Sequence, residues 1–296
     1  MIHGMHKSLT IDELELVAND IRQDIIRMLE HAGSGHVAGP LGQADIFTAL
    51  YFDVMKHDPK NPDWEERDIL VQSNGHTVPV RYAAMARAGY FDRAELMTLR
   101  QLGSRLQGHP ERTKLPGLET TSGPLGEGLS QGCGMALAMR MDQQHHRWVY
   151  VTTGDGELNE GNNWEAIMLA GKYKLSNLIA IVDRNNIQID GPTEVVMPLE
   201  DLKAKWEAFG WHVLEIDGNN LEAVIDACAM ARAIVEKPVC IIAHTIPGKG
   251  VDFMENDFHW HGYFVQTPEG PELKKVAKEA LHELRTLQGK IRSEHE

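Results

Sequence analysis

Two oxygen-bearing side chains, Asp155 and Asn185, each stand just beyond an apolar segment short enough to be a buried strand, at residues 148–153 and 178–182. A helical pattern over 163–174, with Ile167, Leu169 and Ala170 on its apolar side, connects the two segments, so the sequence predicts one βαβ unit. A right-handed crossover brings the ends of both strands to the same edge of a parallel sheet, where ligands of open α/β sheets bind. We therefore expect both side chains in neighbouring loops at that edge.

A carboxylate and an amide oxygen that converge in this way suit a hard divalent cation. Mg²⁺ takes about six oxygens, usually few from the protein and the rest from phosphates and water. Gly154 and Gly156, on either side of Asp155, would let the backbone turn tightly around the carboxylate. Asp and Asn are also common turn residues, but their joint position after two strands of one crossover favours the cation site. The sequence thus predicts half of a magnesium site that a diphosphate would complete.

Four histidines, His36, His76, His109 and His261, each lie next to a glycine in a predicted loop. One such histidine is more often a turn or surface residue than a catalyst. Four of them beside loops at the sheet edge favour a site that binds oxyanions and moves protons.

A glycine-rich turn at 121–128 precedes the helix expected at 129–140. Its bare N–H groups and the helix dipole could hold an anion. Close packing of the helix on the sheet is an equally good explanation.

Strand and helix patterns alternate along the chain, which predicts an α/β fold with a doubly wound, mostly parallel sheet and helices on both faces. We expect a single domain over 1–296, with tails at 1–9 and 286–296 that fray. The glycine-rich stretch 33–42 is expected to be irregular. Further strands are expected at 68–72, 211–216 and 239–243, and helices at 10–33, 43–55, 76–88, 93–101, 199–209 and 221–235.

Composition narrows the class of protein. The formal charge of −14 argues against nucleic acid or an anionic membrane as a partner. No apolar run is long enough to span a bilayer, and the N-terminus resembles no secretory signal. The three cysteines are odd in number and unclustered, as expected for buried thiols of a reducing compartment. We therefore expect a cytoplasmic protein.

The Gly-Asp-Gly turn followed at a distance by Asn185-Asn186 resembles the thiamine diphosphate motif of transketolases, decarboxylases and 2-oxo acid dehydrogenases. The surrounding motifs resemble the transketolase family, and in particular the N-terminal subunit of split transketolases, over roughly residues 10–265. This resemblance implies the diphosphate-binding domain of the thiamine diphosphate-binding fold.

The same resemblance implies catalytic roles. His36 in Gly-Ser-Gly-His and His109 in Gly-His-Pro match substrate-contacting histidines of the family. His261 matches a histidine shared by diphosphate and substrate, and Glu160 matches an acid that joins active sites across a subunit interface.

Cofactor and metal roles follow in the same way. Asp155, Asn185 and the carbonyl of Ile187 match the ligands of Mg²⁺, or of Ca²⁺ or Mn²⁺ in its place. The residues that match contacts to thiamine diphosphate are His76, Gly123, Pro124, Leu125, Gly126, Gly154, Gly156, Asn185 and His261. Two positions depart from the family: Val37 replaces a common proline, and Glu127 stands where glutamine is usual and is expected to point away from the phosphates.

In this family a second α/β domain supplies the glutamate that engages the pyrimidine ring of the cofactor, and no second set of alternating elements follows residue 265. The resemblance therefore implies a partner chain that carries the pyrimidine-binding and C-terminal domains, in an α2β2 assembly acting on sugar phosphates. The complete enzyme would pass a two-carbon ketol unit from a ketose to an aldose. Two alternatives stay open: the α subunit of a 2-oxo acid dehydrogenase, and a non-catalytic binding or regulatory relative.

Overall fold

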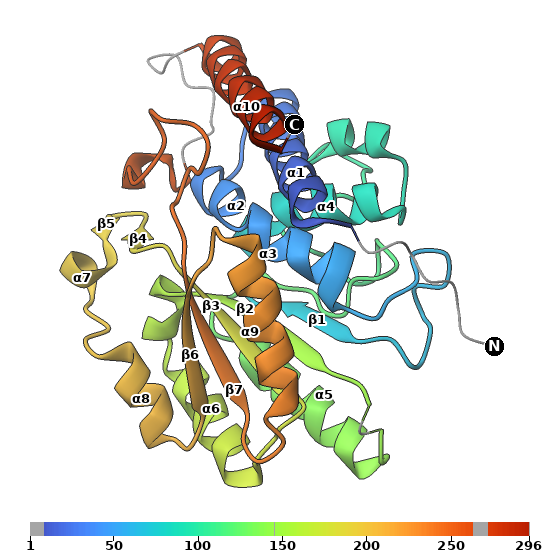
Figure 1. Cartoon of the computed structure of the whole chain (residues 1–296), viewed down its shortest axis with the longest axis vertical. Coiled ribbons are helices and arrows are strands. Elements are labelled where there is room, and N and C mark those ends of the chain that lie inside the picture. Colours follow the sequence, from blue (N-terminus) through green and yellow to red (C-terminus); the bar gives the residue numbers. More distant parts are fainter. Residues whose placement is uncertain (1–8, 145, 263–271, 296) are drawn as a thin grey trace.

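A five-stranded sheet lies at the centre of the computed structural model, which describes residues 9–144, 146–262 and 272–295. The strand order is β1-β2-β3-β7-β6, and every pairing in this sheet is parallel (Figure 1). The predicted α/β sheet is therefore confirmed. Its strands are β1 (Ile69–Gln72), β2 (Val149–Gly154), β3 (Leu178–Arg184), β6 (His212–Asp217) and β7 (Val239–His244).

Helices cover both faces of the sheet, as a doubly wound fold requires. The crossovers that leave β1, β2 and β3 carry α5 (Gly128–Met141), α6 (Gly161–Tyr173) and α8 (Leu202–Ala208), and these pack on one face. The return from β6 to β7 reverses direction and puts α9 (Leu221–Ala233) on the opposite face, as right-handed crossovers dictate. That face is shared with α1 (Ile11–Ala32), α3 (Ala44–Ala49) and α4 (Val78–Ala88).

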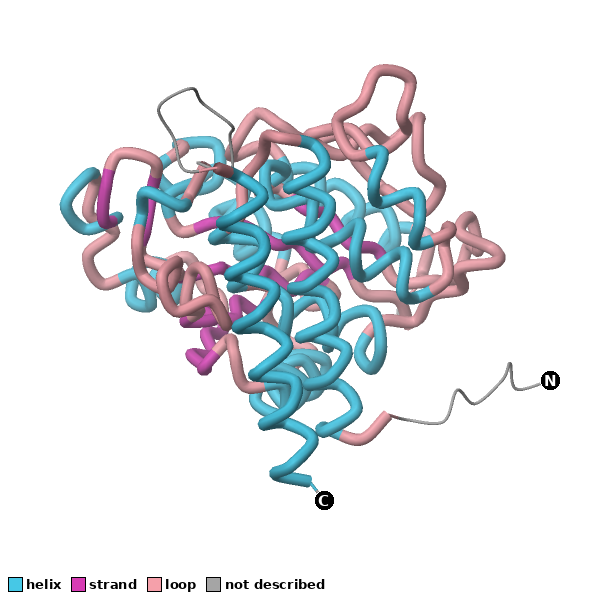
Figure 2. Tube along the Cα trace, turned by 90° about the horizontal axis from the view of Figure 1, so that it is seen from above, coloured by secondary structure: helices cyan, strands magenta, loops and turns pink. Residues whose placement is uncertain are grey.

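The first helix begins at a capping box. Thr10 Oγ1 accepts the backbone N–H of Glu13 at 3.2 Å, and the Glu13 carboxylate accepts the N–H of Thr10 at 2.9 Å. Helix α10 (Leu273–His295) packs along α1 and buries Leu284 (Figure 2). It remains helical to His295, beyond residue 286 where fraying was expected, while residues 1–8 lie outside the described part. No helix in the described ranges is long and apolar enough to cross a membrane.

The structure differs from the sequence-based expectations at three places. Residues 38–42 form a buried helical turn, α2 (Ala38–Gly42), because burial forces the backbone groups of this glycine-rich stretch to pair, as in the bond from Gln43 N–H to the Gly39 carbonyl at 3.0 Å. Leu169, expected on the apolar side of α6, is 41% exposed. An antiparallel hairpin of β4 (Ile187–Gln188) and β5 (Gly191–Pro192), followed by α7 (Thr193–Val196), was not expected at all.

The remaining elements are single turns that connect the longer ones. Helix α3 runs into a π-helical turn, η1 (Leu50–Val54), and four further turns are 3-10 helical. These are η2 (Gly75–Thr77), η3 (Arg93–Thr98), η4 (Gly156–Asn159) and η5 (Phe258–Trp260).

Candidate active site

The two loop tips that follow β2 and β3 meet at the carboxyl edge of the sheet. The backbone N–H of Asn186 donates to Oδ2 of Asp155 at 2.8 Å, and Thr193 Oγ1 donates to the same oxygen at 3.2 Å. The parallel register aligns Gly154 with Asp183, so the strands end side by side. The proximity expected from the βαβ pattern is therefore present in the structure.

A cavity of about 200 Å³ opens over these tips. Its walls combine side chains from five separated loops, which explains why residues far apart in sequence share it. Of the residues singled out from the sequence, it is lined by His76, Leu125, Gly154, Asp155, Gly156, Asn185, Ile187 and His261.

A buried hydrogen-bond chain fixes the Asn185 side chain. Its Nδ2 donates to Oδ2 of Asp183 at 2.7 Å, and its Oδ1 accepts the N–H of Ile187 at 3.0 Å. Asp183 also accepts bonds from Gln43 Nε2 at 2.8 Å and from the hydroxyl of Thr245. Burial raises the pKa of Asp183 to about 7, against the effect of these bonds. Asp183 and Gln43 were not identified from the sequence, although Asp183 directly follows the strand predicted at 178–182.

The glycines around Asp155 act differently from the expectation. Neither Gly154 nor Gly156 has a positive φ, and Asp155 itself is in the right-handed helical region at φ −66°. The turn therefore does not depend on left-handed glycine. A Cβ at Gly154 would meet no protein atom closer than 3.8 Å, so the missing side chain keeps the cavity open beside the carboxylate instead.

Glu157 ties together three loops of the cavity, and no pattern in the sequence singled it out. It is 3% exposed. Its Oε1 accepts the N–H of Gly126 at 2.8 Å and the hydroxyl of Ser73, and its Oε2 accepts the N–H of Gly154 at 3.0 Å. Burial raises the pKa of this carboxyl and the three hydrogen bonds oppose the rise. The loops after β1 and β2 and before α5 thus share one carboxylate.

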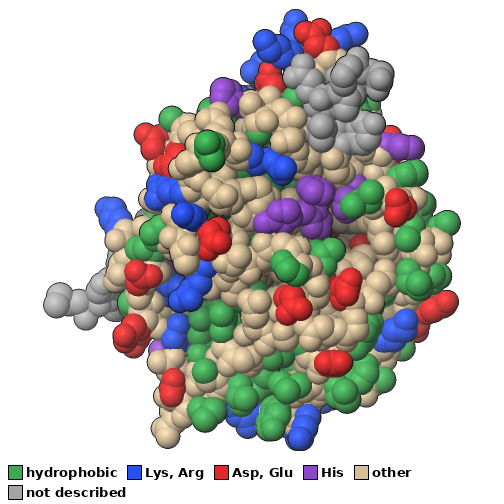
Figure 3. Space-filling model, turned by 180° about the vertical axis from the view of Figure 1, so that it is seen from behind, with side chains coloured by type: hydrophobic (Ala, Val, Ile, Leu, Met, Phe, Trp, Pro, Cys, Tyr) green, Lys and Arg blue, Asp and Glu red, His purple; other side chains and the backbone are tan. Residues whose placement is uncertain are grey.

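Three histidines pack ring against ring at the mouth of the cavity. The ring centroids of His36 and His76 lie 4.8 Å apart, those of His76 and His261 5.3 Å, and those of His36 and His261 5.7 Å. Figure 3 shows histidines gathered in a depression on the rear face. Burial lowers the pKa of His36 to about 4 and that of His76 well below 6.5, and the neighbouring histidines add to both effects. Burial also lowers the pKa of His261, so the cluster is neutral at physiological pH and can accept protons.

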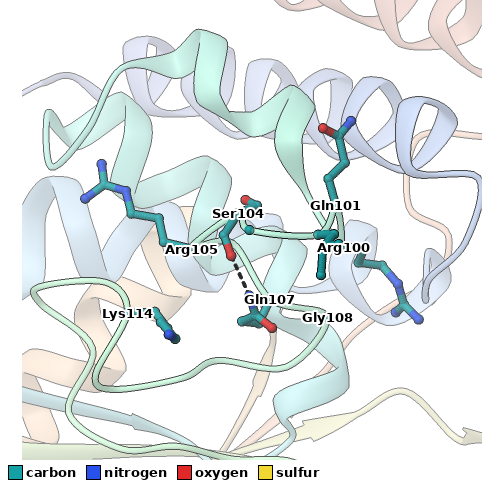
Figure 4. A pocket seen from close by; sticks show the side chains of 9 residues that line it. Arg100, Gln101, Ser104, Arg105, Gln107, Gly108 and Lys114 are labelled. Carbon is teal, nitrogen blue, oxygen red and sulfur yellow. Dashed lines mark hydrogen bonds between the residues drawn. The ribbon is translucent and has the colours of Figure 1, made fainter.

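His109 extends this cluster toward a basic loop. Its ring lies against Gly123, and burial, followed by the charge of Arg100, lowers its pKa. Arg100 has a φ of +60°, and its Nη1 would lie 2.9 Å from a Cβ at Gly108. Arg100 and Lys114 also border a separate cavity of about 610 Å³ (Figure 4). Arg100 is a residue that sequence reasoning missed.

The other singled-out residues lie around the cavity rather than in its lining. Gly123 and Pro124 precede Leu125 in the loop before α5, and Pro124 is exposed. Glu160 is exposed at the start of α6, with its Cβ 2.6 Å from where a side chain on Gly126 would begin. Glu127 is exposed and away from the lining. The substitution of proline by Val37 leaves a fully buried side chain ahead of α2.

Comparison with known proteins decides the family. Residues 14–279 match the family model described as "Transketolase, thiamine diphosphate binding domain". The chain belongs to the transketolase family. It is 45% identical over 249 residues to the 6-deoxy-6-sulfo-D-fructose transketolase subunit SqwG of a Clostridium strain, covering 84% of this chain and 90% of that protein. It is 40% identical over 276 residues to an apulose-4-phosphate transketolase subunit of Phocaeicola vulgatus, covering 93% of this chain and 98% of that protein.

Solved transketolases share the fold. The transketolase of Pichia stipitis in complex with sedoheptulose-7-phosphate superposes with a TM-score of 0.82 at 33% identity, and that of Campylobacter jejuni with 0.81 at 35%. These matches cover 96% and 95% of this chain but only 46% and 48% of the longer enzymes. The chain thus spans a little under half of each full-length transketolase. The predicted resemblance to transketolase-family transferases, and to the N-terminal subunit of split ones, is confirmed.

The donor atoms of this transketolase-family pocket fit a diphosphate-bound Mg²⁺. Asp155 and Asn185 offer side-chain oxygens, and Pro192, the hairpin partner of Ile187, has no N–H to donate to the Ile187 carbonyl. The side-chain oxygens of Asp155 and Asn185 and the carbonyl oxygen of Ile187 are hard ligands, as Mg²⁺ prefers. Phosphate and water oxygens would complete the coordination shell. Within the described ranges, no group of three or more His, Cys, Asp or Glu side chains could hold a metal on its own. The pocket therefore suits a cation that arrives with phosphate ligands.

Proposed function

We propose that this chain is the thiamine diphosphate-binding subunit of a two-chain, Mg²⁺-dependent transketolase. The complete enzyme moves a two-carbon ketol unit from a ketose or ketose phosphate to an aldose or aldose phosphate. The observation that carries the proposal is that the Asp155 and Asn185 loop tips line one cavity together with His76 and His261, and that the ring of His36 packs against both of these histidines. We also propose that the whole chain forms one diphosphate-binding domain.

In this proposal Asp155, Asn185 and the Ile187 carbonyl hold the cation that carries the diphosphate. Gly154 leaves room for the phosphates, Gly156 lies against the diphosphate, and the Gly123–Gly126 loop faces the ring system of the cofactor. Thiamine diphosphate, when bound, supplies the nucleophilic carbon and the electron sink of the reaction.

The histidines act on the sugar. His36, His109 and His261 bind substrate hydroxyls and accept or return protons as the carbon–carbon bond breaks and re-forms. Their lowered pKa values favour the neutral ring, in which one nitrogen has a lone pair that can accept a hydrogen bond or a proton. The Nδ1 atom of His261 is buried without a hydrogen-bond partner in the structure, which suits a group that bonds to a ligand.

Apolar side chains outside the core support a partner chain. Met168, Leu169 and Tyr173 of α6 are 41–54% exposed, and Met141 at the end of α5 is 75% exposed. Figure 3 shows apolar side chains spread over the rear face below the histidines. We assign this face, together with Glu160, to contact with a chain that carries the pyrimidine-binding domain, in an α2β2 assembly. Such a chain would supply the half that full-length transketolases have in addition.

The substrate is proposed to carry an anionic group. The relatives from Clostridium and Phocaeicola vulgatus are named for a sulfonated and a phosphorylated sugar. In this chain Arg100 places a positive charge close enough to His36 and His109 to lower the pKa of both, whereas the chain as a whole is strongly acidic. The three buried free cysteines are consistent with the proposed cytoplasmic location.

Reconstitution tests the proposal. The purified chain is mixed with a candidate partner chain, Mg²⁺, thiamine diphosphate, a ketose phosphate and an aldose acceptor, and ketol transfer is followed by product analysis. We expect transfer only when both chains are present. Full activity of this chain alone would overturn the two-chain proposal. Release of CO2 from a 2-oxo acid without ketol transfer would favour the dehydrogenase alternative, and no cofactor binding with the partner present would favour a non-catalytic relative.

A further inference from the structure

Arg184 bonds directly to the carboxylate that is proposed to hold the metal. It ends β3, between Asp183 and Asn185, and its Nη1 donates to Oδ2 of Asp155 at 3.0 Å. Its Nη2 bonds to Oε1 of Glu194, on α7, at 2.5 Å. The side chains of Arg184 and Asp155 are 11% and 2% exposed, so solvent screens their interaction little.

The donors around Asp155 are divided unevenly between its two oxygens. Oδ2 accepts from Arg184, from the N–H of Asn186 and from the hydroxyl of Thr193. Among the residues that the structure describes, the one donor to Oδ1 is the N–H of Gly156, at 2.7 Å. A cation that uses Oδ1 therefore leaves the Arg184 bond in place, and a guanidinium and a divalent ion then share one carboxylate.

Sharing has an electrostatic consequence. The pair of Arg184 and Asp155 carries no net charge, so the pocket attracts a bare divalent cation less than a lone carboxylate would. Two positive groups a few ångströms apart also repel each other, and an interaction of this kind changes an equilibrium by about tenfold or more in a poorly solvated site. A diphosphate brings negative charge that offsets the repulsion and is itself attracted by the guanidinium.

We propose that Arg184 is a positioning residue that disfavours the binding of bare metal ions at Asp155, so that the divalent cation is taken up together with the diphosphate. The inference rests on the proposed metal site. Glu194 moderates this effect, because its negative charge partly offsets the positive charge of Arg184. The Glu194 side chain is 44% exposed and therefore screened by solvent, so Glu194 affects metal binding at Asp155 less than Arg184 does.

Replacing Arg184 and replacing Glu194 should change metal binding in opposite directions. Arg184→Gln removes the competing charge and should tighten the binding of Mn²⁺ alone by about tenfold. Glu194→Gln frees more of the guanidinium charge for Asp155 and should weaken Mn²⁺ binding by about twofold. Arg184→Lys keeps the positive charge, so its affinity for Mn²⁺ alone should stay near that of the unchanged chain. Lys203→Gln, which removes a positive charge from an exposed pair with Glu215, is the matched control and should change nothing.

The measurement is the free Mn²⁺ signal in electron paramagnetic resonance, titrated with the full-length chain co-purified with its co-expressed partner, with and without thiamine diphosphate. We expect thiamine diphosphate to strengthen Mn²⁺ binding by a larger factor in the unchanged protein than in Arg184→Gln. A residue with only a structural role would weaken metal binding when replaced. Equal or weaker binding of Mn²⁺ alone by Arg184→Gln, with fold retained by circular dichroism, would overturn the inference while leaving the proposed function intact. Absence of Mn²⁺ binding by the unchanged protein with thiamine diphosphate would overturn both.

Discussion

The Asp183 carboxylate accepts the side-chain amide of Asn185 at 2.7 Å, and this bond decides which end of that amide faces the cavity. Because Nδ2 is held by Asp183, Oδ1 lies on the side of Ile187, where it accepts a backbone N–H at 3.0 Å. A metal needs the oxygen and not the nitrogen. The buried Asp183 carboxylate thus orients one of the proposed metal ligands.

Asn185→Asp should destabilise the metal-free chain. The change replaces a donor by a second carboxylate against buried Asp183, so one hydrogen bond is lost and two acceptors face each other. We expect the free energy of unfolding to fall by about 2 kcal/mol or more, measured by urea denaturation with a chelator present. The control is Asn61→Asp, at an exposed position away from the cavity, which should stay within about 0.5 kcal/mol. Equal stability of the two variants would contradict the assigned bond.

Gly128→Ala should disturb the loop before α5. A Cβ at Gly128 would lie 2.7 Å from the Cα of Ser73 and closer still to its Cβ, so the backbone itself must move. We expect a loss of about 1–3 kcal/mol in thermal or urea unfolding. Gly134→Ala, in the same helix with no atom within 4 Å, should instead stabilise the chain by about 0.5–1 kcal/mol. Similar effects of the two changes would show that the close approach to Ser73 is absent.

Glu157→Gln tests the carboxylate that joins three loops. Glutamine has one acceptor oxygen, and its NH2 group must face one of the N–H donors of Gly126 or Gly154, which leaves that donor unpaired. We expect a loss of about 2–3 kcal/mol in unfolding free energy. With the partner present, the affinity for thiamine diphosphate should also fall. This affinity is measured by the quenching of protein fluorescence when the cofactor binds. Glu165→Gln, at an exposed position on α6, is the control and should be neutral. A fully stable Glu157→Gln chain would argue against the bridging role.

The parts of the site that could be predicted are those that depend on the parallel direction of neighbouring strands. Asp155 and Asn185 could be placed together because both follow strands of one crossover, and this needs only periodicity and handedness. The role of Glu157 could not be foreseen, because its partners are backbone N–H groups of loops distant in sequence. Arg184 reads as an ordinary charged strand end until its contact with Asp155 is seen. The same holds for α2, whose short helical turn is set by burial against its neighbours and not by local propensity.

The histidine cluster should make stability fall in acid, and His36 offers the clearest test. Burial and its neighbours lower its pKa to about 4 in the folded chain, from an ordinary value of 6.5. The unfolded chain therefore binds this proton more readily, so the stability contribution is complete above about pH 6.5 and is lost progressively as the pH falls from there to about 4. We expect the loss from this residue between about pH 7.5 and 4.5 to be about 2–3 kcal/mol. His36→Asn should remove that part of the pH dependence in urea unfolding, whereas His212→Asn, at an exposed position on the edge strand β6, should keep it. Parallel stability–pH curves for the unchanged chain and His36→Asn would mean that His36 titrates alike in both states.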